Sequence, residues 1–280
     1  MQTLVEGYRI GRSLEPEHPF STYSHPAYEA EASGRRVVLK LVRRTFPLRP
    51  ESQRWYRELM QRAAQLRAPS LVPVLDAGIT EPDAEPWYAM ELVAGEALET
   101  MLRRGTTFAP AHAAAIVAQL AAAAAAGRAA DIAPALVAKH VMIDGERALA
   151  WDFGIGRWLS RAHDLVQGQY TAPGNAHWTF DLTPADARGT PPAPSDDAAA
   201  LALLAFRMLS GRYYWNAAHA AVTSGDFQPM PLLLEIIGGA NEPAQARSPV
   251  ALPAGFDDWF AACLGGTVAS AEDAARTLPR

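Results

Sequence analysis

Strand signals and helix signals occupy different parts of this chain. Short β-branched runs dominate the beginning, and the clearest, Val37–Val42, follows the turn sequence Ser33–Arg35, which predicts a strand that leaves a hairpin. Beyond the hinge-like stretch Val93–Gly95 the chain becomes rich in alanine and in helical patterns. Strands followed by helices are typical of an α+β fold, so we expect a small β-rich lobe over residues 1–93 and a larger helical lobe over residues 94–280.

The hydrophobic spacing predicts particular elements within these lobes. Residues Glu51–Leu66 are expected to form a helix, since one face carries Trp55, Leu59, Ala63 and Leu66. The other expected elements are strands at Leu71–Leu75 and Trp87–Leu92, a helix at Ala111–Ala126, a hairpin from Val141–Ile143 to Ala148–Trp151, and a helix at Asp197–Leu209. Because Ala198–Phe206 is apolar throughout, we expect this last helix to be buried on every side.

Charge and cysteine content narrow the classes of partner. A net charge of -5 and a pI near 5.8 give no general attraction to nucleic acid or to anionic membranes. The single cysteine, Cys263, excludes an intramolecular disulfide and suits a reducing compartment. The N-terminal sequence lacks a signal-peptide pattern, and the alanine-rich stretch Ala109–Ala126 is less hydrophobic than a membrane span requires. We therefore predict a cytoplasmic protein that neither binds nucleic acid nor inserts into a membrane.

Two charged residues lie on elements that are otherwise apolar. Lys40 interrupts the strand Val37–Val42, and Glu58 lies at the margin of the apolar face of the first helix. Buried charges are costly unless they pair, so one interpretation is an ion pair that clamps the helix to the small lobe. The other is that Lys40 extends to solvent and that Glu58 is a surface residue.

The order of these residues along the chain resembles the bacterial Hanks-type serine/threonine protein kinases. The resemblance runs from about Tyr8 to Gly211 and is carried by Lys40, Glu58, the strand Ala89-Met90-Glu91-Leu92, the triplet Asp152-Phe153-Gly154, and Asp197 before a buried helix. It implies a protein-kinase-like two-lobe fold. It also implies a nucleotide site at Lys40, Glu58, Met90, Glu91, Val93, Trp151, Asp152, Phe153 and Gly154, with a structural role for Asp197.

The loop that covers the nucleotide phosphates in such kinases has lost its glycines. Glycine is needed there because backbone N–H groups must approach the phosphates closely. No glycine occurs between Arg12 and Ser33, and the three glycine positions hold Phe20, Thr22 and His25. We do not expect this segment to cradle phosphates.

The catalytic loop also departs from the family pattern. Ala133-Pro134-Ala135 stands where the family has its HRD triplet, so Ala135 replaces the aspartate that orients the substrate hydroxyl. Val137 replaces a lysine, and His140 replaces the asparagine that holds a magnesium ion. Imidazole is a poor ligand for Mg²⁺, so we predict no metal site, with Asp152 the only remaining metal ligand.

Bulky side chains border the expected nucleotide cleft. Trp151 precedes the DFG triplet, Val38 stands where the family has a small alanine, and Met90 is the expected gatekeeper. The tryptophan either fills the cleft or turns into the core, and the sequence does not decide between these arrangements.

The segment after the DFG triplet carries two further departures. Gly174 replaces the glutamate of the family's APE triplet, and residues 263–271 contain no arginine to pair with such a glutamate. The segment also holds the aromatic residues Tyr170, Trp178 and Phe180, which either form a partner surface or pack against the large lobe.

These losses predict a catalytically inactive pseudokinase, not an enzyme, that acts as a protein-binding scaffold or allosteric regulator in signalling. We expect ATP binding to be weak or absent, magnesium not to bind, and the partner to be a protein. The alternative is a divergent enzyme that uses Lys40, Glu58 and Asp152 for a non-standard phosphoryl or nucleotidyl transfer. In that case Asp131 is the acidic residue near enough in sequence to serve as base.

Overall fold

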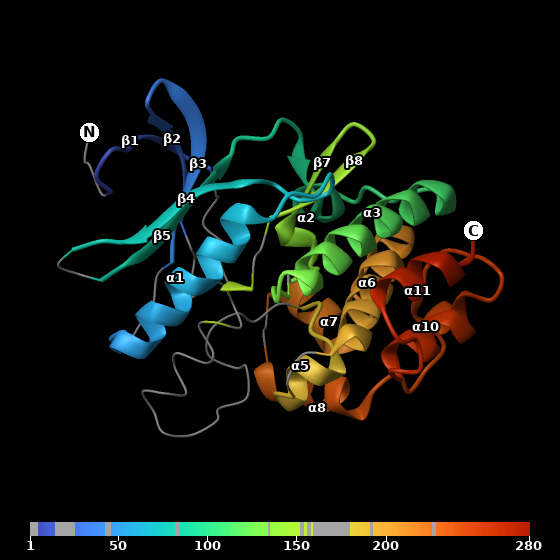
Figure 1. Cartoon of the computed structure of the whole chain (residues 1–280). Coiled ribbons are helices and arrows are strands. Elements are labelled where there is room, and N and C mark those ends of the chain that lie inside the picture. Colours follow the sequence, from blue (N-terminus) through green and yellow to red (C-terminus); the bar gives the residue numbers. More distant parts are fainter. Residues whose placement is uncertain are drawn as a thin grey trace.

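The computed structural model of the chain describes residues 5–14, 26–42, 46–81, 84–133, 135–151, 154–155, 158, 180–190, 193–225 and 228–280. Figure 1 shows a sheet-containing part at the N-terminal end beside a larger helical part. The element order confirms the α+β class, because the strands of the first sheet precede the long helices of the second part.

The first sheet is antiparallel throughout, with strand order β1-β2-β3-β5-β4. Its strands are β1 (Arg9–Ser13), β2 (Ala27–Ala32), β3 (Arg35–Leu41), β4 (Val74–Ile79) and β5 (Pro86–Glu91). Alternation along β3 places Val37, Leu39 and Leu41 in one buried cluster, while Val38 lies in another on the opposite face. A strand was expected at Leu71–Leu75, but β4 begins at Val74, and Leu71 forms an isolated parallel bridge with Ala150.

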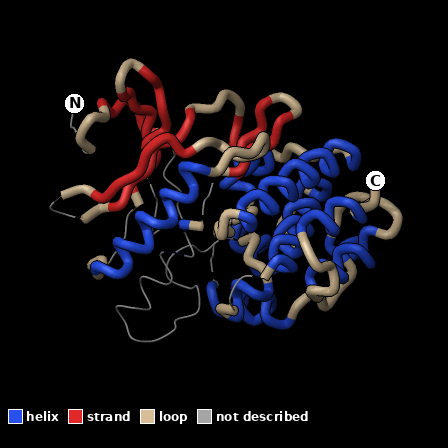
Figure 2. Tube along the Cα trace, viewed as in Figure 1, coloured by secondary structure: helices blue, strands red, loops and turns tan. Residues whose placement is uncertain are grey.

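Helix α1 (Pro50–Gln65) lies along one face of this sheet, as Figure 2 shows. A proline in its first turn suits the helix start, where the missing N–H would have no partner. The helix buries Ser52, Tyr56, Leu59, Met60 and Ala63. The predicted apolar face was therefore right at Leu59 and Ala63, whereas Trp55 and Leu66 are only partly buried.

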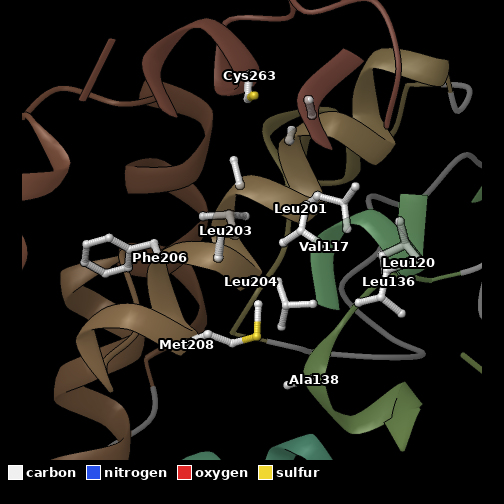
Figure 3. Close-up of a cluster of buried hydrophobic side chains, with 14 of the residues drawn as sticks. Val117, Leu120, Leu136, Ala138, Leu201, Leu203, Leu204, Phe206, Met208 and Cys263 are labelled. Atoms are coloured by element: carbon white, nitrogen blue, oxygen red, sulfur yellow. The ribbon is translucent and has the colours of Figure 1, made fainter. Parts of the chain in front are cut away.

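The C-terminal part is built around helix α6 (Pro194–Ser210), which confirms the predicted buried helix. Every residue from Asp197 to Ser210 except Ala200 is buried. Other helices in the described residues of this part are α2 (Leu98–Arg103), α3 (Pro110–Ala129), α5 (Pro184–Arg188), α7 (Asn216–Ser224), α8 (Pro229–Gly238), α9 (Ala244–Arg247), α10 (Phe256–Leu264) and α11 (Ala271–Thr277). Helices α3, α10 and α11 pack against α6, and Figure 3 shows side chains of this core, with Val117 and Leu120 from α3 beside Leu201 and Leu204 from α6.

Helix α3 carries the alanine-rich stretch. Among the residues that the structure describes, only this helix is long and apolar enough to cross a membrane by length and composition. Half of its most apolar stretch is buried inside the protein, against α6 and α11. Alanine at these positions lets neighbouring helices approach closely.

A smaller sheet joins the two parts. It consists of β6 (Glu96–Ala97), β7 (Val141–Asp144) and β8 (Arg147–Ala150), and the β7–β8 hairpin is the predicted one. The boundary expected after Val93 falls in the short connection between β5 and β6. Gly95 in this connection has φ +109°, and a Cβ there would lie 2.2 Å from the carbonyl oxygen of Ile143, so only glycine fits.

A buried cluster of charges connects three elements of the helical part. Arg207 on α6 is 3% exposed and donates hydrogen bonds to Glu99 on α2, at 2.7 and 3.0 Å, and to Asp181, at 3.1 Å. The guanidinium also lies 3.8 Å from the ring centre of Tyr213. Burial raises the pKa of Asp181 to about 6, in spite of the opposing charge of Arg207. Burial alone would also raise the pKa of Glu99, but the charge and hydrogen bonds of Arg207 lower it to about 2.

The raised pKa of Asp181 predicts a pH dependence of stability. Its pKa in the folded state, about 6, lies above the ordinary value of 3.8, so the folded chain keeps a proton that the unfolded chain releases. This contribution to the free energy of unfolding therefore falls, by about 2 kcal/mol, as the pH rises from about 4.5 to 7. The lowered pKa of Glu99 has the opposite effect on the free energy of unfolding, which falls as the pH drops below 4.5, the ordinary pKa of a glutamate.

Urea unfolding of the wild type and of Asp181→Asn at several pH values measures this contribution. The amide does not titrate, so the wild type should lose about 2 kcal/mol relative to the variant between about pH 4.5 and 7. Parallel pH profiles for the two proteins would contradict the assignment.

Candidate active site

Lys40 lies near the middle of the first sheet and is almost completely buried. Strand β3 pairs with β2 on one side and β5 on the other, with Lys40 opposite Ala27 and Tyr88. Alternation puts Lys40 on the same face of β3 as Val38, toward α1. Only 3% of the residue is exposed, so the interpretation that Lys40 extends to solvent is wrong.

Trp151 lies against this lysine. The Nζ atom of Lys40 is 4.0 Å from the centre of the Trp151 ring, which is a cation–π distance. On its other side the indole meets the ring of His140 edge-on, with centroids 4.6 Å apart, and the backbone N–H of Trp151 donates to the His140 carbonyl at 3.1 Å. The indole thus lies on Lys40 and also packs against the buried cluster that contains Val38 and Met90, so neither of the two expected arrangements describes it alone.

Glu58 does not pair with Lys40. Among the described residues no ion pair joins the two, and Glu58 is exposed on α1. The reason is the orientation of the helix, since α1 turns Tyr56, Leu59 and Met60 toward the sheet and leaves Glu58 outside this face. The predicted clamp between Lys40 and Glu58 is therefore wrong for this structure, and Glu58 is a surface residue here.

Trp158 holds α1 in this orientation. Its indole N–H donates to the carbonyl oxygen of Ser52 at 2.9 Å, and its ring lies 5.0 Å from the ring of Tyr56. The hydroxyl of Tyr56 in turn donates to the carbonyl oxygen of Trp87 at 2.7 Å. The sequence reasoning missed Trp158, although a second tryptophan seven positions after Trp151 was a visible signal.

A cavity of about 360 Å³ opens between α1 and the loop that follows α3. Glu58 and Arg62 from α1 line it, opposite Asp131 and Ala133 from the loop. Asp131 has φ +55°, its side chain is 94% exposed, and its carboxylate lies 3.9 Å from the guanidinium of Arg62. Gly154 also lines this cavity, so Asp131 and the end of the DFG triplet border one space.

The predicted catalytic loop is largely apolar in the structure. Ala135 is partly buried and is followed by the buried Leu136 and Val137. The short 3-10 helix Ala138–His140 then leads into β7. No acidic residue occurs in the sequence between Asp131 and Asp144, so the loop itself offers no carboxylate.

Asp197 forms an ion pair with an arginine that the sequence did not reveal. Arg128, near the end of α3, donates to both carboxylate oxygens of Asp197, at 2.7 and 3.0 Å. The same guanidinium donates to the carbonyl oxygen of Ala193 at 2.7 Å. A bidentate pair of this kind fixes α6 against α3.

The remaining predicted site residues lie at the hinge or outside the described part. Met90 is buried in the same cluster as Val38, Val93 is partly buried beside it, and Glu91 pairs with Arg35 at 3.5 Å on the surface. Phe180 packs edge-on against Tyr213, with centroids 5.3 Å apart, which agrees with packing against the large lobe. The predicted residues that lie outside the described part of the chain are Phe20, Thr22, His25, Pro134, Asp152, Phe153, Tyr170, Gly174 and Trp178.

The described residues do not fit a magnesium site. Within them, no group of three or more His, Cys, Asp or Glu side chains gathers as a metal site would require. His140, at the expected metal position, packs its ring against Trp151, and imidazole is a poor ligand for Mg²⁺. We therefore derive no step through this metal.

No protein-family model matches the chain, but individual proteins do. It is 28% identical over 187 residues to the "Probable serine/threonine-protein kinase" of Corynebacterium efficiens, a match that covers 64% of this chain and 27% of that protein. It is 38% identical over 128 residues to the serine/threonine-protein kinase PknE of Mycobacterium bovis, covering 44% and 20%. With PknA of Mycobacterium tuberculosis it shares 27% identity over 190 residues, covering 64% and 42%. The matched stretches thus span less than half the length of each relative.

The solved structures agree with these relatives in fold. The crystal structure of the Mycobacterium tuberculosis PknI kinase domain superposes with a TM-score of 0.68. The superposition covers 98% of this chain and 95% of that domain, at 20% sequence identity. At this identity the likeness shows the fold alone, and it confirms the predicted kinase-like architecture.

The names of the relatives contradict the prediction that this chain is an inactive pseudokinase and not an enzyme. Each of the three relatives is named as a serine/threonine protein kinase. That prediction rested on departures at individual positions, namely Ala135, His140 and the missing glycines. The chain therefore has the protein-kinase fold, and its relatives in sequence are bacterial serine/threonine protein kinases.

Proposed function

We propose that this domain transfers the terminal phosphoryl group of ATP to a serine or threonine hydroxyl of a protein. The observation that carries the proposal is the set of relatives in sequence, all named as kinases of this kind. Lys40 supports the proposal, because its ammonium group is buried on β3. The kinase resemblance assigns the phosphate-binding lysine to this strand and to this place in the order of motifs along the chain.

In this proposal the reaction proceeds without an aspartate at position 135, because another carboxylate takes its role. The transition state of phosphoryl transfer is loose, with little covalent chemistry for the protein to perform, so most of the rate comes from holding the reactants in line and stabilising charge. A buried ammonium stabilises developing phosphate charge more strongly than an exposed one, because water does not screen it. Lys40 has this property.

We propose Asp131 as the carboxylate that orients the acceptor hydroxyl and accepts its proton. It lies on the loop that holds Ala133, lines the same cavity as Gly154, and presents an exposed carboxylate. Its φ of +55° is uncommon for a residue other than glycine, and such backbone conformations often occur at functional sites.

The variant Asp131→Asn tests this role. We expect the rate constant for phosphoryl transfer to casein to fall about 100-fold with little change in KM for ATP, since the amide keeps the shape but cannot accept a proton. Asp144→Asn is the matched control, because Asp144 is a partly exposed carboxylate at the end of β7 that pairs with Arg147 at 3.5 Å. Equal rates for wild type and Asp131→Asn would remove Asp131 from the reaction.

The proposal also names a donor and an acceptor for the reaction. ATP is the phosphoryl donor, bound weakly, and the protein partner is the substrate that carries the hydroxyl. Binding without magnesium, the absence of nucleic-acid binding, and a location in the cytoplasm without membrane insertion stay predictions. The acidic pI of about 5.8 supports the absence of nucleic-acid binding. Repeating the transfer assay with and without Mg²⁺ tests whether ATP binds without magnesium.

A further inference from the structure

The most consequential contact in the candidate site joins Trp151 to Lys40. We infer that the Trp151 indole is a displaceable cover over the Lys40 ammonium, and that it sets the affinity of the site for the nucleotide phosphates. This inference rests on the proposed function, because it concerns the site at which ATP would bind.

The geometry makes the indole and a phosphate competitors for the same lysine. The Nζ atom lies 4.0 Å from the ring centre of Trp151, and only 3% of Lys40 is exposed. A phosphate oxygen that pairs with an ammonium must come within about 2.7–2.9 Å of the nitrogen. Since Lys40 is almost fully enclosed, a phosphate reaches it only after a neighbouring side chain moves.

Trp151 is a neighbour of Lys40 whose ring can move without breaking the sheet. It follows directly after β8, whose last ladder pair joins Ala150 to Val141, so rotation of the indole breaks no strand hydrogen bond. Unlike Lys40, Trp151 is only partly buried. Its backbone N–H stays bonded to the carbonyl oxygen of His140 at 3.1 Å and anchors the main chain while the ring swings.

The contacts of the ring set the cost of moving it. They are the cation–π contact with Lys40, the edge-on contact with the ring of His140 at 4.6 Å, and packing against the hydrophobic cluster that contains Val38 and Met90. A cation–π contact of about 0.5–2 kcal/mol corresponds to roughly a 2-fold to 30-fold change in an equilibrium constant. We therefore expect a variant without the aromatic ring to bind ATP about tenfold more tightly than the wild type.

Isothermal titration calorimetry with ATP on the full chain tests this inference. Trp151→Leu removes the π face and keeps an apolar side chain, so it should bind ATP about tenfold more tightly. Trp151→Phe keeps a smaller ring over Lys40 and should show a gain of about threefold. The double variant Lys40→Met with Trp151→Leu should lose the gain, because the gain comes from the uncovered ammonium.

The control is the same substitution on the other face of the sheet. Trp87 packs with the cluster of Leu39 and Leu41, away from Lys40, so Trp87→Leu should leave the ATP affinity unchanged. Circular dichroism establishes whether each variant is folded. If Trp151→Leu does not fold, Trp151→Phe still tests the inference.

The inference and the proposed function fail in different ways. If the Trp151 variants bind ATP no more tightly than the wild type, Trp151 does not cover Lys40. The same conclusion follows if the double variant with Lys40→Met keeps the increase in ATP affinity. Tighter binding in Trp151→Leu, without any transfer of phosphate by the wild type, would support the cover and count against the proposed kinase activity.

Discussion

Replacing Arg207 with methionine is expected to lower the free energy of unfolding by about 3–5 kcal/mol, a large fraction of the stability of an ordinary domain. Methionine fills much of the same space but leaves the carboxylates of Glu99 and Asp181 without their shared cation. Their side chains are only 16% and 9% exposed, so water cannot take over the role of the guanidinium. Urea unfolding at pH 7, followed by circular dichroism, measures the loss.

Arg103→Met is the matched control for this prediction. Arg103 also pairs with Glu99, at 2.7 Å, but its side chain is 42% exposed. Exposed ion pairs contribute little, so this variant should lose less than about 1 kcal/mol. Equal losses for the two arginine variants would contradict the account of the buried cluster.

A triple variant separates charge from packing. Combining Arg207→Met with Glu99→Gln and Asp181→Asn also removes the two carboxylates that the guanidinium binds, so most of the lost stability should return. If stability does not return, the role of Arg207 is packing against Tyr213, whose ring centre lies 3.8 Å from the guanidinium.

Replacing Lys40 with methionine is expected to lower phosphoryl transfer at least about 100-fold, comparable to the loss of one essential electrostatic group from an active site. The ammonium is the buried positive charge that the kinase resemblance assigns to the nucleotide phosphates, and methionine keeps its length without its charge. The initial rate of phosphate transfer from ATP, compared between wild type and variant, measures this effect.

The thermal stability of Lys40→Met shows whether a lower transfer rate comes from the lost charge or from unfolding. Methionine keeps an apolar side chain at a site that is 3% exposed, so the variant should still unfold cooperatively, and its melting temperature is measured beside that of the wild type. Arg35→Met on the same strand is the control for a lost positive charge, because Arg35 lies at the surface, where it pairs with Glu91 at 3.5 Å. Its transfer rate should stay close to that of the wild type.

The sequence predicted those elements whose signal is local. Helix α6 and the β7–β8 hairpin follow from hydrophobic runs and turn residues that lie within a few positions of one another. The prediction failed at Leu71–Leu75, where an apolar run serves as core rather than as strand. Leu71 is buried in the core cluster of the helical part and forms only an isolated bridge, and the ladder with β5 begins at Val74.

The site was harder to predict, because its contacts join distant parts of the chain. Nothing near Asp197 points to Arg128 as its partner, and nothing near Glu99 points to Arg207. The orientation of α1, which decides whether Glu58 meets Lys40, depends on the contact between Trp158 and Ser52. Such pairings are set by tertiary packing, which periodicity does not encode.

The prediction of inactivity failed for a related reason. It read catalysis from individual positions, chiefly Ala135 and His140, whereas 64% of the chain is similar to proteins named as serine/threonine kinases. The structure adds Asp131, a carboxylate at the cavity shared by the loop and Gly154. That residue is where the proposed reaction departs most from the family pattern.

Transfer of labelled phosphate from γ-labelled ATP is the most direct test of the proposed activity. The full chain is incubated with the nucleotide and with dephosphorylated casein, beside Lys40→Met at the same concentration, and phosphoserine and phosphothreonine are then quantified. The account predicts label on these residues with the wild type and at least about 100-fold slower labelling with the variant. No label with the wild type, or equal label with the variant, would contradict it.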